Sequence, residues 1–170
     1  MARRPTPKSL NRVAPKADPP RTHTLDDPQR ILLIRPSALG DVCRSVPVLA
    51  SLRRGFPHAT IDWLVQDSFV DAVSAHPALD AAIPFPRKAL GRALRGGHVA
   101  MLLGWIAALR SRRYDLVLDA QGLLRSGFFA WCTRARTRVG YDNAQEHASI
   151  FYTQRVDAPR DRHAVDRMLM

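Results

Sequence analysis

The sequence lacks any apolar run approaching the roughly 18 residues that a membrane-spanning helix needs. Its first thirty residues contain arginine and proline but no apolar segment of the kind that a secretory signal carries. Only two cysteines occur, Cys43 and Cys132, and they are too far apart in the sequence to indicate a disulfide framework or a zinc site. We therefore expect a soluble chain in the reducing cytoplasm.

Acidic residues are missing between Asp80 and Asp115, although the whole chain of 170 residues has a net charge of +11. The cations in this acid-free segment are Arg87, Lys88, Arg92, Arg95, Arg110, Arg112 and Arg113. A local positive field of this kind attracts phosphorylated or carboxylated partners. A solvated surface explains the same residues, and charge alone does not separate the two interpretations.

Two common phosphate-binding motifs are also missing, the P-loop GxxxxGK[ST] and the dinucleotide fingerprint GxGxxG. No cluster of histidine, cysteine or carboxylate residues has the spacing of a metal site. The sequence therefore predicts neither a metal nor a tightly bound cofactor.

Apolar patterns divide the chain into alternating elements. Residues 1–29, rich in proline and basic side chains, are expected to be a disordered tail. The patterns predict strands at 30–35, 60–65, 79–85, 114–122 and 137–141, helices at 42–55, 68–75, 98–113 and 123–132, and a basic loop at 87–97. This alternation indicates an α/β fold with a mostly parallel, Rossmann-like sheet over residues 30–160. Residues 161–170 read as the start of a linker helix, with Asp161 as its cap.

Two loops follow predicted strands, "PSALGD" at 36–41 and "DAQGLLRS" at 119–126. In an open α/β sheet, ligands bind beyond the carboxyl ends of the strands, where such loops lie. Gly40 is expected to allow a tight turn. Asp41 then lies near a helix N-terminus, where it serves either as the cap or as a general base facing a crevice.

The motifs resemble a known family. The stretch "ILLIRPSALGDVCRSVPVLASLRRGFPHATIDWLV", followed by "RRYDLVLDAQGLLRSG", "RVGYD" and "DRHAVDR", is similar to the ADP-heptose:lipopolysaccharide heptosyltransferases, and most of all to their heptosyltransferase I branch. The resemblance covers residues 30–170. It implies the amino-terminal half of a GT-B glycosyltransferase, in which two Rossmann-like domains enclose the active site and the nucleotide-sugar domain is absent from this chain.

The resemblance also assigns roles to individual residues. It implies that Asp41 is the catalytic base of an inverting transfer. The acceptor-binding residues that it implies are Ser37, Gly40, Arg87, Lys88, Gln121 and Gly122. The donor would be ADP-heptose, bound mainly by the other domain, and the acceptor a Kdo-lipid A glycolipid at the cytoplasmic face of the inner membrane. The 170-residue chain alone is expected to be inactive, with possible peripheral contact to that membrane through its arginines.

Two departures from the family pattern keep a second interpretation open. Ala38 replaces a hydroxyl residue of the turn, and Gln145–Glu146 stands where the family has an arginine. A noncatalytic module that binds acidic glycolipid, or a relic of a truncated gene, is consistent with both. A nucleic-acid-binding role is disfavoured, because aromatic residues do not interleave with the basic segment. Asp119 is expected to orient its neighbouring loop rather than to act as a second base.

Overall fold

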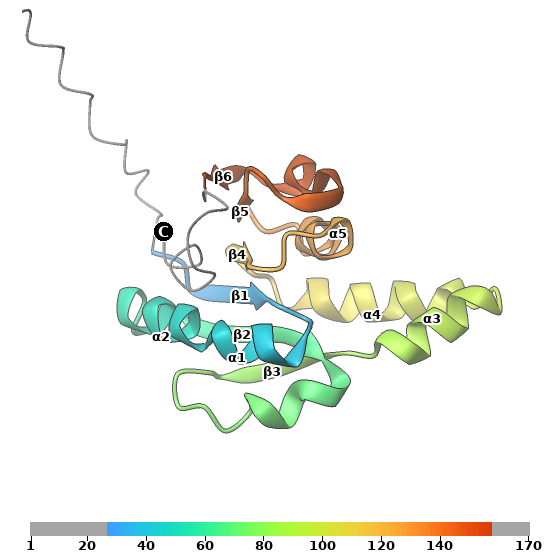
Figure 1. The fold of residues 1–170 in the computed structure, drawn as a ribbon, viewed down its shortest axis with the longest axis horizontal. Coiled ribbons are helices and arrows are strands. Elements are labelled where there is room, and N and C mark those ends of the chain that lie inside the picture. Colours follow the sequence, from blue (N-terminus) through green and yellow to red (C-terminus); the bar gives the residue numbers. More distant parts are fainter. Residues whose placement is uncertain (1–26, 158–170) are drawn as a thin grey trace, which may run out of the picture.

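The computed structural model describes residues 27–157, so the expectations for the tail and for the helix from Asp161 lie outside the described residues. The elements in chain order are β1 (Arg30–Ile34), α1 (Leu39–Arg44), α2 (Val46–Gly55), β2 (Thr60–Gln66), η1 (Asp67–Ala72), β3 (Ala81–Phe85), α3 (Arg87–Arg95), α4 (Val99–Ser111), β4 (Leu116–Asp119), α5 (Leu124–Cys132), β5 (Thr137–Tyr141), η2 (Gln145–Phe151) and β6 (Gln154–Val156). Strands and helices alternate as the sequence predicts (Figure 1).

The strands form a six-stranded sheet in the order β3-β2-β1-β4-β5-β6, and every neighbouring pair is parallel. The chain builds outward from β1 through β2 to β3, then returns to the other side of β1 with β4. All the carboxyl ends therefore meet at one edge, and the direction of winding reverses between β1 and β4. The predicted Rossmann-like α/β class is confirmed.

Both faces of the sheet are covered, because successive side chains of β1 point to opposite sides. Ile31 and Leu33 pack in a cluster that includes residues of α1 and α2. Leu32 and Ile34 pack in a second cluster with residues of α3, α4 and α5. A buried strand with apolar residues on both faces is typical of a parallel sheet.

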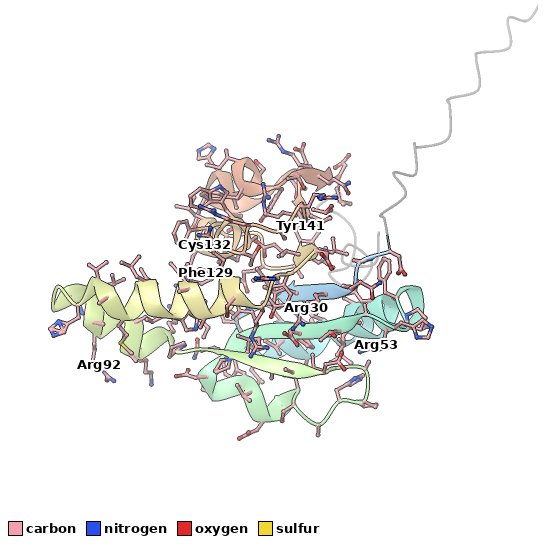
Figure 2. The ribbon with its side chains drawn as sticks, turned by 180° about the vertical axis from the view of Figure 1, so that it is seen from behind. Arg30, Arg53, Arg92, Phe129, Cys132 and Tyr141 are labelled. Carbon is pink, nitrogen blue, oxygen red and sulfur yellow. The ribbon has the colours of Figure 1, made fainter. Side chains whose placement is uncertain are left out.

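An aromatic group fixes α4 and α5 on the second face. The ring centroids of Phe85, Trp105 and Phe129 lie 5.5, 5.0 and 4.9 Å apart in pairs, with tilted or edge-to-face geometry. Phe129 lies between the helices and the sheet (Figure 2). The indole of Trp105 also donates to the carbonyl of Pro84 at 3.1 Å. These aromatic contacts hold one side of α4 against the body of the protein. The other side of α4 faces outward.

The helix predicted after β1 is two helices, α1 and α2, which are divided at Ser45. Pro47 lies in the first turn of α2. Its missing N–H is tolerated there, since the first helical N–H groups have no partner within the helix. Pro47 therefore marks the start of a new helix.

The expectation of a loop at 87–97 is wrong, because Arg87–Arg95 form helix α3. Leu90 is buried in the second cluster and holds one side of α3 against the body, while its arginines face outward. The short strand β6 was not predicted either; it pairs with β5 at the edge of the sheet. Among residues 27–157, no helix is both long and apolar enough to cross a bilayer.

Candidate functional site

The loops that follow β1 and β4 meet at the point where the sheet reverses its winding. One guanidinium nitrogen of Arg35, Nη1, donates to the carbonyl of Ala120. The backbone N–H of Ser37 donates to Oε1 of Gln121 at 3.4 Å, a long hydrogen bond. Residues from both predicted loops are therefore brought together where open α/β sheets bind ligands.

Asp41 lies in the first turn of α1 and does not cap it. The N-cap position is Ala38, and no side chain makes a capping hydrogen bond there, so the capping interpretation is wrong. The Asp41 carboxylate contacts Nη2 of Arg35 at 3.0 Å and Nη1 of Arg44 at 3.5 Å. Its side chain is 35% exposed, whereas that of Arg35 is only 11% exposed. The carboxylate is thus held from two sides and open to solvent on another.

Gly40 does not form the tight turn that was expected of it. It lies inside α1, is exposed and has no positive φ, and a Cβ placed on it would meet no atom within 4 Å. The fold therefore does not require glycine at this position. Because Gly40 has no side chain, the backbone of the first turn of α1 is open to solvent next to Asp41.

Gly122 is the glycine whose conformation the site requires. Its φ is +70°, and a Cβ would lie 3.3 Å from Cδ2 of Tyr141. Its N–H donates to Asp119, and its carbonyl accepts from the N–H of Gln145 at 2.9 Å. Gly122 is buried, so its contribution here is to shape the loop that presents the half-buried Gln121.

Asp119, only 1% exposed, organises this loop from below. Its Oδ1 accepts the N–H groups of Gln121 and Gly122 at 2.9 and 3.1 Å, and its Oδ2 accepts the hydroxyl of Tyr152 at 2.7 Å. Burial raises the pKa of Asp119, although the hydrogen bonds from Tyr152 and the loop oppose that rise. Burial and the nearby carboxylate also raise the pKa of Tyr152. The predicted role of Asp119 in orienting its loop agrees with these contacts.

A basic group lies farther along the same edge. Arg87 and Lys88 are exposed at the start of α3, in a helix rather than in the predicted loop. Arg125, in the first turn of α5, has its guanidinium carbon 5.5 Å from the ring centroid of Phe85. The pKa of Arg125 is lowered, mainly by burial and also by the positive charge of Arg87, while Glu146 opposes the effect. Two guanidinium groups that repel each other in this way favour an anion near them.

The sequence analysis assigned no site role to Arg35 or Arg125. Arg35 ends the first apolar run directly before Pro36, and Arg125 stands three residues after Gly122. In the sequence, Arg35 could have been recognised as a cation that directly follows a predicted strand. Neither its contact with Asp41 nor the proximity of Arg125 to Arg87 can be obtained from spacing along the chain.

A separate cavity of about 1230 Å³ lies at the opposite edge of the sheet, near the amino ends of β4 and β5. Its lining includes two acidic residues, Asp27 and Asp115, and four arginines, Arg110, Arg113, Arg134 and Arg136. It does not include any of the predicted site residues. Within residues 27–157, no three histidine, cysteine or carboxylate side chains lie close enough to hold a metal ion.

Comparisons with known proteins indicate the family of the chain. The model of glycosyltransferase family 9 (heptosyltransferase) matches residues 103–170. Lipopolysaccharide heptosyltransferase 1 of Pseudomonas aeruginosa is 38% identical over 148 residues, which are 81% of this chain and 40% of that protein. The enzyme of the same name from Escherichia coli K12 is 30% identical over 142 residues, 81% of this chain and 44% of that protein.

A solved structure shows that the similarity extends to the fold. The E. coli heptosyltransferase WaaC with ADP-2-deoxy-2-fluoro heptose superposes with a TM-score of 0.72 and 31% identity, over 82% of this chain and 45% of that one. The chain thus spans about two fifths of the length of the curated relatives that it matches. Since sequence and fold agree over most of the chain, it belongs to the heptosyltransferase family, glycosyltransferase family 9.

Proposed function

We propose that this chain provides the acceptor side of an inverting heptosyltransferase. In this proposal, heptose passes from ADP-heptose to the Kdo region of the lipopolysaccharide inner core. The observation that carries the proposal is the Asp41 carboxylate, which is partly exposed and held by Arg35 and Arg44 where the β1 and β4 loops meet. Donor binding is assigned mainly to the part of the relatives that this chain does not match.

Asp41 would act as general base. A sugar hydroxyl is a poor nucleophile until a positioned group accepts its proton in the transition state. The hydroxyl oxygen would attack the anomeric carbon of heptose, the bond from that carbon to ADP would break, and ADP would leave with the electron pair. The proton would pass to Asp41. The two arginines serve this step by orientation, since a carboxylate held within hydrogen-bond reach reacts faster than a mobile one.

The acceptor would be recognised by its anionic groups. Arg87, Lys88 and Arg125 are available at the same edge of the sheet, and arginine binds carboxylate or phosphate with two parallel hydrogen bonds. Ser37 and Gln121 are assigned to the sugar hydroxyls. The hydroxyl of Ser37 has no hydrogen-bond partner among residues 27–157, which leaves it available to a ligand.

Reconstitution in trans tests this function. The purified chain is mixed with the carboxyl-terminal part of the P. aeruginosa relative, ADP-heptose and Kdo-lipid A, and the lipid product is detected by mass spectrometry. Asp41→Asn preserves the shape of the side chain and removes the base, so we expect transfer to fall about 10²- to 10⁴-fold. Asp71→Asn, an exposed carboxylate on η1, is the matched control and should retain the rate. A transfer rate for the Asp41→Asn variant within about twofold of the original would refute the assignment.

A noncatalytic glycolipid-binding module is the second candidate. It is favoured by Glu146, whose carboxylate accepts the N–H of Leu124 at 3.1 Å and so places an acid at the start of α5. That position is where the resemblance leads one to expect an arginine. Binding of Kdo-lipid A without any transfer in trans, and without loss of binding in Asp41→Asn, would favour this second function.

A further inference from the structure

Helix α4 is apolar on every side, although it lies at the surface. Its sequence from Val99 to Leu109, VAMLLGWIAAL, contains no charged residue. A helix of this kind is normally enclosed by protein or by lipid. Here only one side is covered, through Leu109 and the aromatic contacts of Trp105. The outward side is apolar as well and exposes Val99, Ala100, Met101, Leu103, Gly104, Ala107 and Ala108.

The larger exposed side chains gather at the free end of the α3–α4 hairpin. Leu94, Val99 and Met101, next to the turn between the helices, are 46–47% exposed. Leu103, one turn farther along α4, is 60% exposed and also lines the cavity described above. Every residue from 94 to 101 is exposed. Figure 1 shows the two helices running side by side past the sheet, in the direction in which β1 points. The hairpin therefore projects from the carboxyl edge, the edge that carries Asp41.

Cations lie along α3 beside this apolar end. Arg92 and Arg95 are exposed in its last turn, next to the free end, and Arg87 and Lys88 are exposed in its first turn. The side chain of Arg92 extends away from the body (Figure 2). The segment from 81 to 114 contains no acidic residue to neutralise them. An apolar surface with a basic border is the pattern by which a helix lies in the interface of an anionic membrane.

We propose that the α3–α4 hairpin docks this protein on an anionic lipid bilayer. Leu94, Val99, Met101 and Leu103 enter the boundary between headgroups and acyl chains, while the α3 cations bind lipid phosphates. A second copy of the chain is a poorer partner for this surface, because symmetric pairing would bring the same cations face to face. Docking would also turn the carboxyl edge of the sheet, with Asp41, toward the membrane.

Vesicle co-sedimentation with the full chain tests the proposal. One set of vesicles is phosphatidylcholine alone, and the other contains phosphatidylcholine mixed with phosphatidylglycerol. We expect binding to the mixed vesicles that weakens as salt rises. Leu103→Glu should lower the partition coefficient about tenfold or more, because it places a charge where an apolar side chain is buried. Arg92→Glu with Arg95→Glu should lower it to a similar extent on the mixed vesicles.

Matched controls come from elsewhere on the surface. Ile150→Glu alters an apolar residue on η2 that is 66% exposed, and Arg54→Glu reverses an exposed cation on α2. Both should bind like the original chain. Leu103→Trp should bind more tightly, since tryptophan prefers the membrane interface, and an unchanged thermal unfolding midpoint separates this gain from misfolding.

Three results would overturn the proposal. The first is no binding to the mixed vesicles, and the second is equal loss in the hairpin and control variants. The third is a dimer in sedimentation velocity that Leu103→Glu dissociates while vesicle binding stays unchanged, which would make this surface a contact between copies. None of these measurements depends on heptose transfer, so docking and the proposed transfer can fail separately.

Discussion

Tyr152→Phe tests whether the buried carboxylate below the candidate site is charged. The Tyr152 hydroxyl donates to Oδ2 of Asp119 at 2.7 Å, and both residues are buried, at 7% and 1% exposure. Phenylalanine keeps the ring and removes only this donor. Hydrogen bonds to charged groups contribute about 1.5–3 kcal/mol, and a buried acceptor left without its partner carries the full desolvation cost. We therefore expect the free energy of unfolding at neutral pH to fall by about 2–3 kcal/mol.

The loss of stability in Tyr152→Phe should change with pH in a direction that follows from the pKa of Asp119. The pKa of Asp119 is raised in the folded state, so its contribution to stability is complete below the ordinary value of 3.8 and declines as pH rises through the folded pKa. The Tyr152 hydroxyl opposes that rise, and its removal should raise the folded pKa further. The variant is therefore expected to lose most stability at neutral pH and to approach the original protein under acidic conditions.

Tyr114→Phe is the matched control. Its hydroxyl donates to Oδ2 of Asp62 at 2.6 Å, in a second buried tyrosine–aspartate pair. The same oxygen of Asp62, however, also contacts Nη1 of Arg112 at 3.0 Å and keeps this partner in the variant, whereas Gln121 and Gly122 bond to the other oxygen of Asp119. We expect a smaller loss for Tyr114→Phe.

Urea unfolding monitored by tryptophan fluorescence at several pH values measures these differences. A Tyr152→Phe deficit below about 0.5 kcal/mol at neutral pH would contradict the reasoning, since an unpaired buried acceptor costs more than that. A deficit of the same size from neutral to acidic pH would also contradict it. In that case the Asp119 carboxyl would not be the group that responds.

Two further pairs of variants test the backbone and the ion pairs of the site. Gly122→Ala should lower the free energy of unfolding by about 1–3 kcal/mol because of its positive φ, whereas Gly40→Ala in α1 should be neutral or stabilising by up to about 1 kcal/mol; losses of equal size in urea unfolding would refute the distinction. Arg35→Met removes a largely buried partner of Asp41 and should cost about 1–3 kcal/mol. Arg44→Met removes the exposed partner and should cost less than about 1 kcal/mol, and thermal unfolding should show the difference.

The candidate site was predicted in part. The position of Asp41 after the first strand follows from the local pattern of an apolar run, a proline and a helix start. The contact that holds its partner Arg35 does not, because Arg35 reaches the carbonyl of Ala120 only when β1 and β4 are neighbours. The acceptor-binding roles of Ser37, Gln121 and the α3 cations stay predictions.

The errors arise where a local preference was taken by itself. Gly40 was expected to make a turn because glycine permits one, yet it lies inside α1, and at the candidate site Gly122 adopts positive φ instead. Residues 87–97 were expected to be a loop because charges and glycines dominate there, yet burial of Leu90 stabilises a helix. In the second case a contact that is distant in the sequence outweighed a local preference.

The sequence by itself determined the α/β class, the strands and most of the helices, because an apolar strand or an amphipathic helix is specified by residues that are close along the chain. Tertiary structure alone decided which loops meet, which carboxylates are buried and which side of α4 stays exposed. Those properties depend on the order of strands in the sheet, and this order brings together residues some 85 positions apart, such as Arg35 and Ala120.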